Sequence, residues 1–226
     1  MSDYSYTILI PSYDRYELLL NEVESIRMQT DSKIVIIDDG STDDRYKTLA
    51  SQIKNLELTS NEKNVGKKSF YKVVKSLITH GLTLKTDFYV FLGDDFIISD
   101  NLMEYLDDIK SPNTIINIFP NQPKKWNSLE WIDGMFLCSD SAMYRILEYI
   151  PNKDNRKQRS TGVWQVVSNR VTNDKDFHIK LTNYSLIQHI GNDENESKLH
   201  PFHRKETPIV SDNFIDDVEN PELKII

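Results

Sequence analysis

The sequence predicts an α/β fold in which helices cover both faces of a mostly parallel sheet. Short strand-like segments alternate with helical segments through the first hundred residues, and this alternation is typical of open parallel sheets. The segment 33–37 is a continuous apolar run after its first residue, Lys33, as expected of a strand that is covered on both faces. Acidic residues follow three of the strand segments directly, at the edge where such sheets bind ligands.

Four strand segments and three helical segments account for most of residues 1–92. The strand segments are short and largely apolar, with proline, glycine or polar residues beside them: residues 6–11, 33–37, 56–59 and 88–92. In the first helical segment, apolar residues recur at the spacing of a helix with one buried face. The helical segments are residues 15–29, residues 45–53, and a third that follows the turn at 64–66 and runs through Ile78.

The second half of the chain is less regular. It predicts a strand at 114–119, a strand or strand pair at 129–139, helices at 141–150 and 162–171, and a strand pair within 178–191. From residue 192 the chain is polar with isolated apolar residues, which indicates a tail that is disordered or is ordered only by a ligand or partner. We therefore expect one domain at 1–191, with halves at 1–105 and 106–191, and a tail at 192–226.

Composition places the chain among ordinary globular proteins. Its 226 residues are 38% hydrophobic and 27% charged, with no apolar run as long as a membrane span and no visible secretory signal. The single cysteine, Cys138, excludes an internal disulfide and fits a reducing compartment, so we expect a cytoplasmic protein. A net charge of −8 argues against a nucleic-acid coat protein. Basic residues nevertheless cluster at 63–75, 123–126, 155–159 and 203–205.

Two adjacent acids end the fourth strand segment. Asp94 and Asp95 follow the apolar residues 88–92 after only Gly93. Two carboxylates at the tip of a core strand repel each other and are costly to bury unless water or a cation compensates them. Asp38 and Asp39 end the second strand segment in the same way, so we expect the two pairs to share one edge of the sheet.

The first hundred residues resemble the family-2 nucleotide-sugar glycosyltransferases, which have the GT-A fold. The resemblance covers residues 5–105 and depends on several motifs in the family's order. These are a strand ending in Pro-Ser-Tyr, a helix ending in Ser-Ile-x-x-Gln-Thr, the run Asp-Asp-Gly-Ser-Thr-Asp, then Asn-x-Gly, and finally a strand leading into an Asp-x-Asp-type motif. It implies that residues 1–105 bind a nucleotide sugar and that residues 106–191 face the acceptor.

By this resemblance, a divalent cation compensates the acids. Mn²⁺ or Mg²⁺ prefers oxygen ligands and stabilises the charge that develops on a departing nucleoside diphosphate. The resemblance implies that Asp95 binds this metal and that Asp94 contacts the donor. Gly93 departs from the family, because it replaces the first acid of Asp-x-Asp. His189, which precedes Gly191 after a strand, is a candidate third ligand, with a histidine satisfied at a strand end as the alternative reading.

The other donor contacts are implied by the same resemblance. Asp38 and Asp39 would lie at the nucleobase and ribose, where a carboxylate that accepts the uracil N3–H would favour a uridine donor. Pro11 and Tyr13 would line the base pocket, and Lys67 or, preferably, Lys68 would face the nucleotide. Without the other motifs, the alternative for Asp38 and Asp39 is a turn followed by a helix cap.

The catalytic base is not evident. Inverting relatives carry an acid on a late helix to deprotonate the acceptor, but the corresponding residues 159–171 contain no acid. Asp133 is the first candidate for this role, followed by Asp140 and Asp154. Alternatively, the enzyme retains the anomeric configuration and needs no carboxylate base. Trp131 and Trp164 are each expected in the core, with a stacking platform for the acceptor as the second interpretation.

Several acceptors and one inactive alternative stay open. A glycan or lipid-linked sugar is the most frequent acceptor in the family, and DNA with hydroxymethylated bases is the second candidate because of the basic clusters. Gly93 replaces an acid of the family motif, and residues 159–171 contain no acid that could act as the base. Both departures from the family also allow an inactive sugar-nucleotide-binding protein. A nucleotidyltransferase is disfavoured because no glycine-rich phosphate loop opens the chain.

Overall fold

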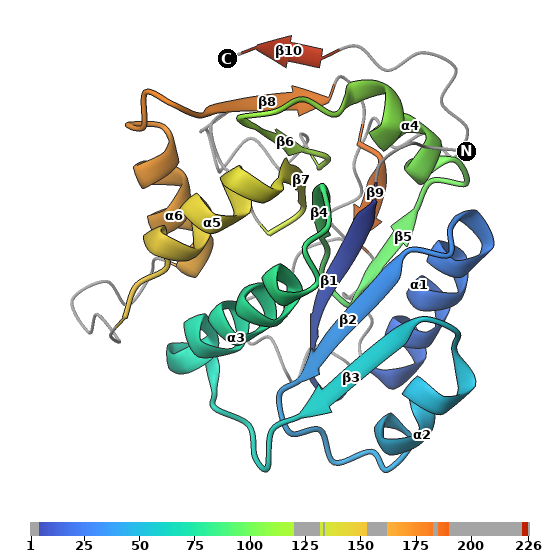
Figure 1. Cartoon of the computed structure of the whole chain (residues 1–226). Coiled ribbons are helices and arrows are strands. Elements are labelled where there is room, and N and C mark those ends of the chain that lie inside the picture. The colour runs from blue at the N-terminus through green and yellow to red at the C-terminus, as the bar shows by residue number, and fades with distance from the viewer. Residues whose placement is uncertain are drawn as a thin grey trace, which may run out of the picture.

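A mixed sheet forms the centre of the molecule. The computed structural model describes residues 5–119, 132, 134–152, 162–182, 185–189 and 223–225. In this part of the chain the main sheet has eight strands in the order β10-β8-β6-β7-β4-β1-β2-β3 (Figure 1). Their bounds are β1 (Tyr6–Ser12), β2 (Lys33–Asp38), β3 (Leu56–Ser60), β4 (Phe88–Phe91), β6 (Thr114–Asn117), β7 (Phe136–Ser139), β8 (His178–Thr182) and β10 (Leu223–Ile225).

The half of the sheet that carries the expected site is parallel. Strand β1 pairs in parallel with both β2 and β4, and β2 pairs in parallel with β3. Strand β7 runs antiparallel to both β4 and β6, while β6 and β8 are parallel. The expected mostly parallel α/β sheet is thus confirmed, with β7 as an antiparallel strand inside it.

Helices cover both faces of the sheet, as predicted. In Figure 1, α3 (Phe70–Thr83), α5 (Asp140–Tyr149) and α6 (Val163–Val171) lie on one side. The other side carries α1 (Tyr16–Gln29), α2 (Tyr46–Gln52) and α4 (Leu102–Ile109). Alternate residues of β1 enter the two cores, with Ile8 and Ile10 on the α1 side and Leu9 on the α3 side, as the two-residue period of a strand requires.

Two short strands form a second sheet on the α1 side. Strand β5 (Phe96–Ile98) pairs antiparallel with β9 (Ile187–His189). The prediction of a strand pair within 178–191 is therefore wrong in its pairing: β8 joins the main sheet, and β9 joins β5. Pairing with β5 lets β9 place Ile187 in the α1-side core, an outcome that depends on a partner about ninety residues away and not on a local hairpin.

The Gln29 side chain ties the end of α1 to the start of α4. Its amide nitrogen donates to the Ser99 carbonyl at 2.9 Å, and its amide oxygen accepts from the Met103 backbone N–H at 3.1 Å. One of the first N–H groups of α4, which has no acceptor within the helix, is thereby satisfied. The glutamine of the Ser-Ile-x-x-Gln-Thr motif therefore has a structural role, because it fixes the segment that follows Asp94 and Asp95.

Most of the expected tail lies outside the described residues. Residues 223–225 are the exception, because β10 pairs antiparallel with β8 at the edge of the main sheet. This end of the chain thus adds a strand that the polar sequence did not predict. The division of the chain at residue 191 stays a prediction.

Candidate active site at the carboxyl edge of the sheet

The carboxyl ends of β1, β2 and β4 bring the two acidic pairs to one edge. In the parallel register Ser12 lies opposite Asp38, and Leu9 lies opposite Phe91. The residues that follow these strands therefore emerge side by side. Asp38, Asp39, Asp94 and Asp95 are all buried there, so the sequence-based expectation of a shared edge agrees with the structure.

A guanidinium lies between the carboxylates of the second pair. Arg15 Nη1 is 3.0 Å from Asp94 Oδ1 and 2.5 Å from Asp95 Oδ2, and all three side chains are at most 9% exposed. The sequence left open whether water or a cation compensates this pair. In the structure the compensating cation is a side chain of the chain itself, and sequence analysis did not single it out.

Asp94 is also held by the main chain of the loop after β1. The Tyr13 backbone N–H donates to Asp94 Oδ2 at 3.1 Å. Burial raises the pKa of Asp94, and the negative charge of Asp95 acts in the same direction, whereas Arg15 and the Tyr13 N–H lower it. Asp94 thus joins the ends of β1 and β4 in a site from which water is largely excluded.

Glu22 adds a third buried carboxyl group beside this pair. It lies on the buried face of α1, is 2% exposed, and neither of its carboxyl oxygens has a hydrogen-bond partner among the described residues. Burial raises its pKa well above the usual range, and the charges of Asp94 and Asp95 raise it further, although the Phe96 backbone acts weakly in the opposite direction. The folded protein therefore favours the protonated form of Glu22 more strongly than water does.

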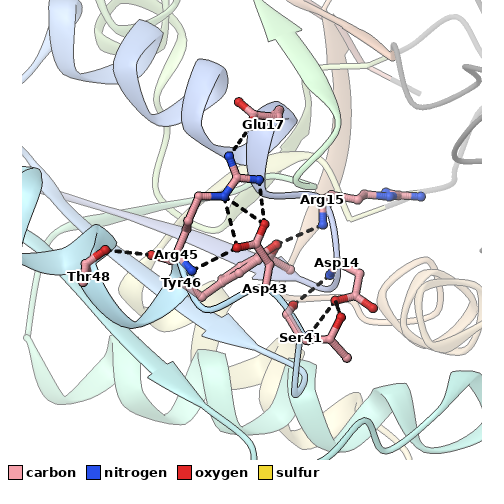
Figure 2. A network of polar contacts seen from close by, with 10 residues as sticks. Asp14, Arg15, Glu17, Ser41, Asp43, Arg45, Tyr46 and Thr48 are labelled. Atoms are coloured by element: carbon pink, nitrogen blue, oxygen red, sulfur yellow. Dashed lines mark hydrogen bonds and ion pairs between the residues drawn. The ribbon is translucent and has the colours of Figure 1, made fainter.

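The loops after β1 and β2 are connected by short side chains (Figure 2). Asp38 accepts hydrogen bonds from the backbone N–H and the hydroxyl of Ser41. The Ser41 hydroxyl oxygen accepts from the Asp14 backbone N–H at 2.8 Å, and Asp14 Oδ1 accepts from the Thr42 backbone N–H at 2.7 Å. Asp14 has a φ of 49°, a conformation that aspartate tolerates better than most residues. Asp38 therefore acts here as a turn anchor.

Tyr46 joins the start of α1 to the end of β1. Its hydroxyl group lies 2.8 Å from Ser12 Oγ and accepts from the Arg15 backbone N–H at 3.0 Å. Arg45, the neighbouring residue, instead pairs with Asp43 and Glu17 near the surface. Figure 2 shows the Arg15 side chain pointing away from this Arg45 cluster. The backbone of Arg15 is thus held by α2, while its guanidinium reaches the β4 acids.

Asp39 organises the loop that contains the Asn-x-Gly motif. Its carboxylate accepts from the Asn61 side-chain amide at 2.8 Å, from the Asn64 side-chain amide at 3.0 Å, and from the Val65 backbone N–H at 3.1 Å. Gly40, with a φ of +77°, packs so closely that an added Cβ would lie 2.5 Å from the Lys63 carbonyl carbon. Glycine at this position is therefore required by both conformation and space.

The remaining residues of the expected donor site lie around this edge. Pro11 is buried in β1 opposite Ile37, Tyr13 is half-buried, and Lys68 is exposed in the short 3₁₀ turn η1 (Lys67–Ser69) before α3. Burial raises the pKa of Tyr13, and the nearby Asp14 raises it further. Pro11 and Tyr13 thus lie at the carboxyl end of β1, and Lys68 lies just before α3.

Comparison with known proteins identifies the family of the chain. The family model described as glycosyl transferase family 2 matches residues 7–168. The chain belongs to glycosyl transferase family 2. This confirms the resemblance seen in the sequence motifs, and a search of the curated proteins finds no match.

The family assignment agrees with similar solved structures. S. aureus TarS 1–349 is 14% identical over 73% of this chain and 54% of its own, with a TM-score of 0.56. Its complexes with UDP and with UDP-GlcNAc each give a TM-score of 0.54 at 14% identity and cover 73% of this chain and 54% and 52% of theirs. At this identity the likeness concerns the fold, and it confirms the GT-A architecture. The chain spans about half the length of these structures.

The Asp-x-Asp region of this family member has a packed glycine. A Cβ on Gly93 would lie 2.6 Å from Cε2 of Phe96, whose buried ring packs edge to face on Phe119. An aspartate at position 93 would therefore have to displace an aromatic ring from the core. In this structure the Phe96 ring fills the space that a side chain at position 93 would need.

The donor atoms near Asp95 are suited to a hard cation. One oxygen from each of Asp94 and Asp95 converges on a single point, where Arg15 Nη1 now lies, and carboxylate oxygens are the ligands that Mn²⁺ and Mg²⁺ prefer. His189 pairs in the second sheet with Phe96, the residue that directly follows Asp95. Among the described side chains no group of three or more acidic, histidine or cysteine residues forms a metal site.

Of the first two candidates for the catalytic base, only Asp140 lies among the described residues. Asp133 lies outside the described residues, although β7 begins soon after it and Phe136 pairs with Phe91 near the end of β4. Asp140 accepts from the Tyr89 hydroxyl at 3.1 Å, and its backbone N–H donates to Asp87 before the start of β4. The Asp140 alternative is therefore wrong, because this residue lies at the opposite end of β4 from Asp94.

Trp164 lies in the hydrophobic core, as expected from the sequence. Trp164 is 7% exposed and packs edge to face on Phe91 and Phe136, so it belongs to the core and not to a stacking platform. Trp131 and Asp154 lie outside the described residues. Within the part of the chain that the structure describes, no helix is long and apolar enough to cross a membrane.

Proposed function

We propose that this chain transfers a sugar from a nucleotide sugar, with a uridine diphosphate leaving group, to an acceptor hydroxyl. The observation that carries this proposal is the meeting of Asp38, Asp39, Asp94 and Asp95 at the carboxyl edge of β1, β2 and β4 in a family-2 fold. The complexes of S. aureus TarS with UDP and UDP-GlcNAc support a uridine donor.

The proposed donor site is divided between the two acidic pairs. Pro11 and Tyr13 line the base pocket, Asp38 and Asp39 lie at the nucleobase and ribose, and Lys68 approaches the phosphates from the η1 turn. Asp39 holds the loop at 61–65 through three N–H groups. Its contribution to donor binding is therefore partly indirect, because it shapes the wall from which Lys68 extends.

Asp94 and Asp95 are proposed to act on the diphosphate side of the donor. Asp94 contacts the donor, and Asp95 holds a divalent cation together with His189. When bound, Mn²⁺ or Mg²⁺ supplies positive charge that stabilises the departing diphosphate. The chain contributes buried carboxylates at a fixed distance from the β1 loop, so the negative side chains are oriented before the donor arrives.

The proposed acceptor is a glycan or a lipid-linked sugar, with Asp133 as the base that receives the acceptor proton. A second acceptor, DNA with hydroxymethylated bases, is favoured by the exposed lysines beside the donor edge, Lys63, Lys67, Lys68 and Lys72. Binding to duplex DNA that weakens steeply with salt would support this second candidate. Binding that is absent at low salt would exclude it.

A thermal-shift panel of nucleotide sugars, with and without Mn²⁺, tests the proposed function. A ligand stabilises the folded protein only if it binds the folded state more tightly than the unfolded state. We expect a uridine diphosphate sugar to raise the melting temperature more than the other nucleotide sugars. The inactive alternative is tested by slow Mn²⁺-dependent hydrolysis of the bound donor, which an active transferase performs and an inactive binder does not.

A further inference from the structure

Arg15 occupies the point at which the carboxylates of Asp94 and Asp95 converge. A single atom, Nη1, lies 3.0 Å from one carboxylate and 2.5 Å from the other. The Arg15 side chain is only 9% exposed, so this is a built internal contact and not a surface ion pair. A metal ion that used the same two oxygens would have to displace the guanidinium.

The position of Arg15 in the chain allows such a displacement. Arg15 precedes α1, and its backbone is held independently of its side chain by the Tyr46 hydroxyl group and by the bond from the Leu19 N–H to the Arg15 carbonyl. The guanidinium is carried on three methylene groups and can rotate to a new partner without moving α1. Guanidinium groups bind phosphate oxygens in the same forked geometry as carboxylates.

The charge around the pair favours an exchange of cations. Asp94 and Asp95 both contact the guanidinium, and Glu22 is a third buried carboxyl group close to these two acids, with no hydrogen-bond partner for its oxygens among the described residues. If Arg15 left without replacement, Asp94 and Asp95 would lose the positive charge that both carboxylates now contact. Its departure is therefore favoured when another cation arrives at the same place.

We propose that Arg15 is an internal competitor for the divalent cation, held by Asp94 and Asp95 until a nucleoside diphosphate gives its guanidinium a second anion to bind. This inference rests on the proposed function, because it assumes a diphosphate donor at this edge. Arg15 then delays cation binding until the donor is present. The metal alone binds weakly, and the metal with nucleotide binds well.

The direct test measures Mn²⁺ alone, without nucleotide, by electron paramagnetic resonance on the full chain. Replacing the guanidinium by a neutral amide, Arg15→Gln, is expected to tighten Mn²⁺ binding at least tenfold. Arg15→Lys keeps the positive charge and is expected to keep the weak binding of the original protein. Arg45→Gln removes an arginine of the same region that pairs with Asp43 and Glu17, and it should leave Mn²⁺ binding unchanged.

Arg15→Gln tests the inference even if this variant does not fold without metal. In that case Mn²⁺, and not K⁺ at equal ionic strength, should restore its circular dichroism spectrum. Arg15→Gln that binds Mn²⁺ no more tightly than the original protein, or that Mn²⁺ cannot refold, would overturn the competitor role. A failure of the proposed function has a different signature, namely no stabilisation of the original protein by any nucleotide sugar with Mn²⁺.

Discussion

The side-chain amide of Asn64 donates a hydrogen bond to Asp39 Oδ2 at 3.0 Å. This contact closes the Asn-x-Gly loop over the end of β2, and the Asn61 amide and the Val65 N–H bind the same carboxylate. Three N–H groups of the loop therefore donate to one buried carboxylate, which holds the loop in place. Hydrogen bonds to a carboxylate are stronger than those between two neutral groups.

The substitution Asp39→Asn should loosen this loop. An asparagine turns one acceptor atom into a donor that faces other donors, so we expect a loss of about 2 kcal/mol in the free energy of unfolding. Hydrogen exchange at the Val65 N–H should accelerate. Asp44→Asn is the matched control, because Asp44 is largely exposed and its carboxylate pairs with Lys47 at the surface. Equal effects of the two substitutions on Val65 exchange would contradict the anchoring role.

Removal of a single hydroxyl group should weaken the junction between β1 and α1. Tyr46→Phe leaves the Arg15 backbone N–H without its buried acceptor and removes the contact with Ser12, so we expect a loss of about 1–3 kcal/mol. Tyr144→Phe, at a tyrosine that is 52% exposed, should change stability little. Urea unfolding of both variants measures this free energy. A Tyr46→Phe protein as stable as Tyr144→Phe would show that the Tyr46 bonds contribute nothing.

Two glycines with nearly the same φ should tolerate alanine differently. Gly40 and Gly66 have φ values of +77° and +76°, but a Cβ would lie 2.5 Å from the Lys63 backbone at Gly40 and 3.8 Å from the nearest atom at Gly66. Gly66→Ala should cost about 1–3 kcal/mol through backbone strain alone. Gly40→Ala adds a clash with main-chain atoms, so it should lower the free energy of unfolding by more than Gly66→Ala does. Thermal unfolding of both variants measures the difference. The reverse order would mean that the two loops do not pack as described.

The buried carboxyl group of Glu22 should make stability depend on pH. Its pKa in the folded protein is raised by burial and by Asp94 and Asp95, so the folded state holds this proton more tightly than the unfolded state. Its contribution is complete below the unfolded pKa of about 4.3 and is lost as the pH rises toward the folded pKa, by at most about 1.4 kcal/mol per pH unit.

Glu22→Gln should remove this dependence. The free energy of unfolding of the variant should exceed that of the original protein increasingly as the pH rises above the unfolded pKa of about 4.3, as measured by urea titrations at each pH. Glu24→Gln changes an exposed glutamate of the same helix and should leave the pH profile as it is. Parallel profiles for Glu22→Gln and the original protein would show that Glu22 is ionised in both states.

The sequence predicted the elements that depend on local patterns. The four strand segments and three helical segments of the first half appear close to the expected residues, because apolar runs and glycine turns act over short distances. Strand β5 and helix α4 were missed. For α4 a signal existed, since Leu102, Tyr105, Leu106 and Ile109 have helical spacing and are buried. Strand β5 has three residues and is defined by its pairing with β9, which no local pattern indicates.

The sequence indicated the location of the site more clearly than its contacts. The paired acids predicted a shared edge, which is present, and they left open whether water or a cation compensates them. The cation is Arg15, which is 79 and 80 residues from Asp94 and Asp95 in the chain. Such a contact arises from parallel pairing of β1 with β4, and the buried position of Glu22 beside it arises from the packing of α1. Neither could be inferred from spacing.

The measurement that tests the central claim most directly is the binding of a uridine diphosphate sugar by calorimetry, with Mn²⁺, to the original protein and to Asp95→Asn. The claim is that the acids after β4 bind the diphosphate end of the donor through a cation. We expect clear binding to the original protein and a loss of at least tenfold in affinity in the variant, whose circular dichroism spectrum should be unchanged. Equal affinity in the folded variant, or no binding of any nucleotide sugar to the original protein, would contradict the claim.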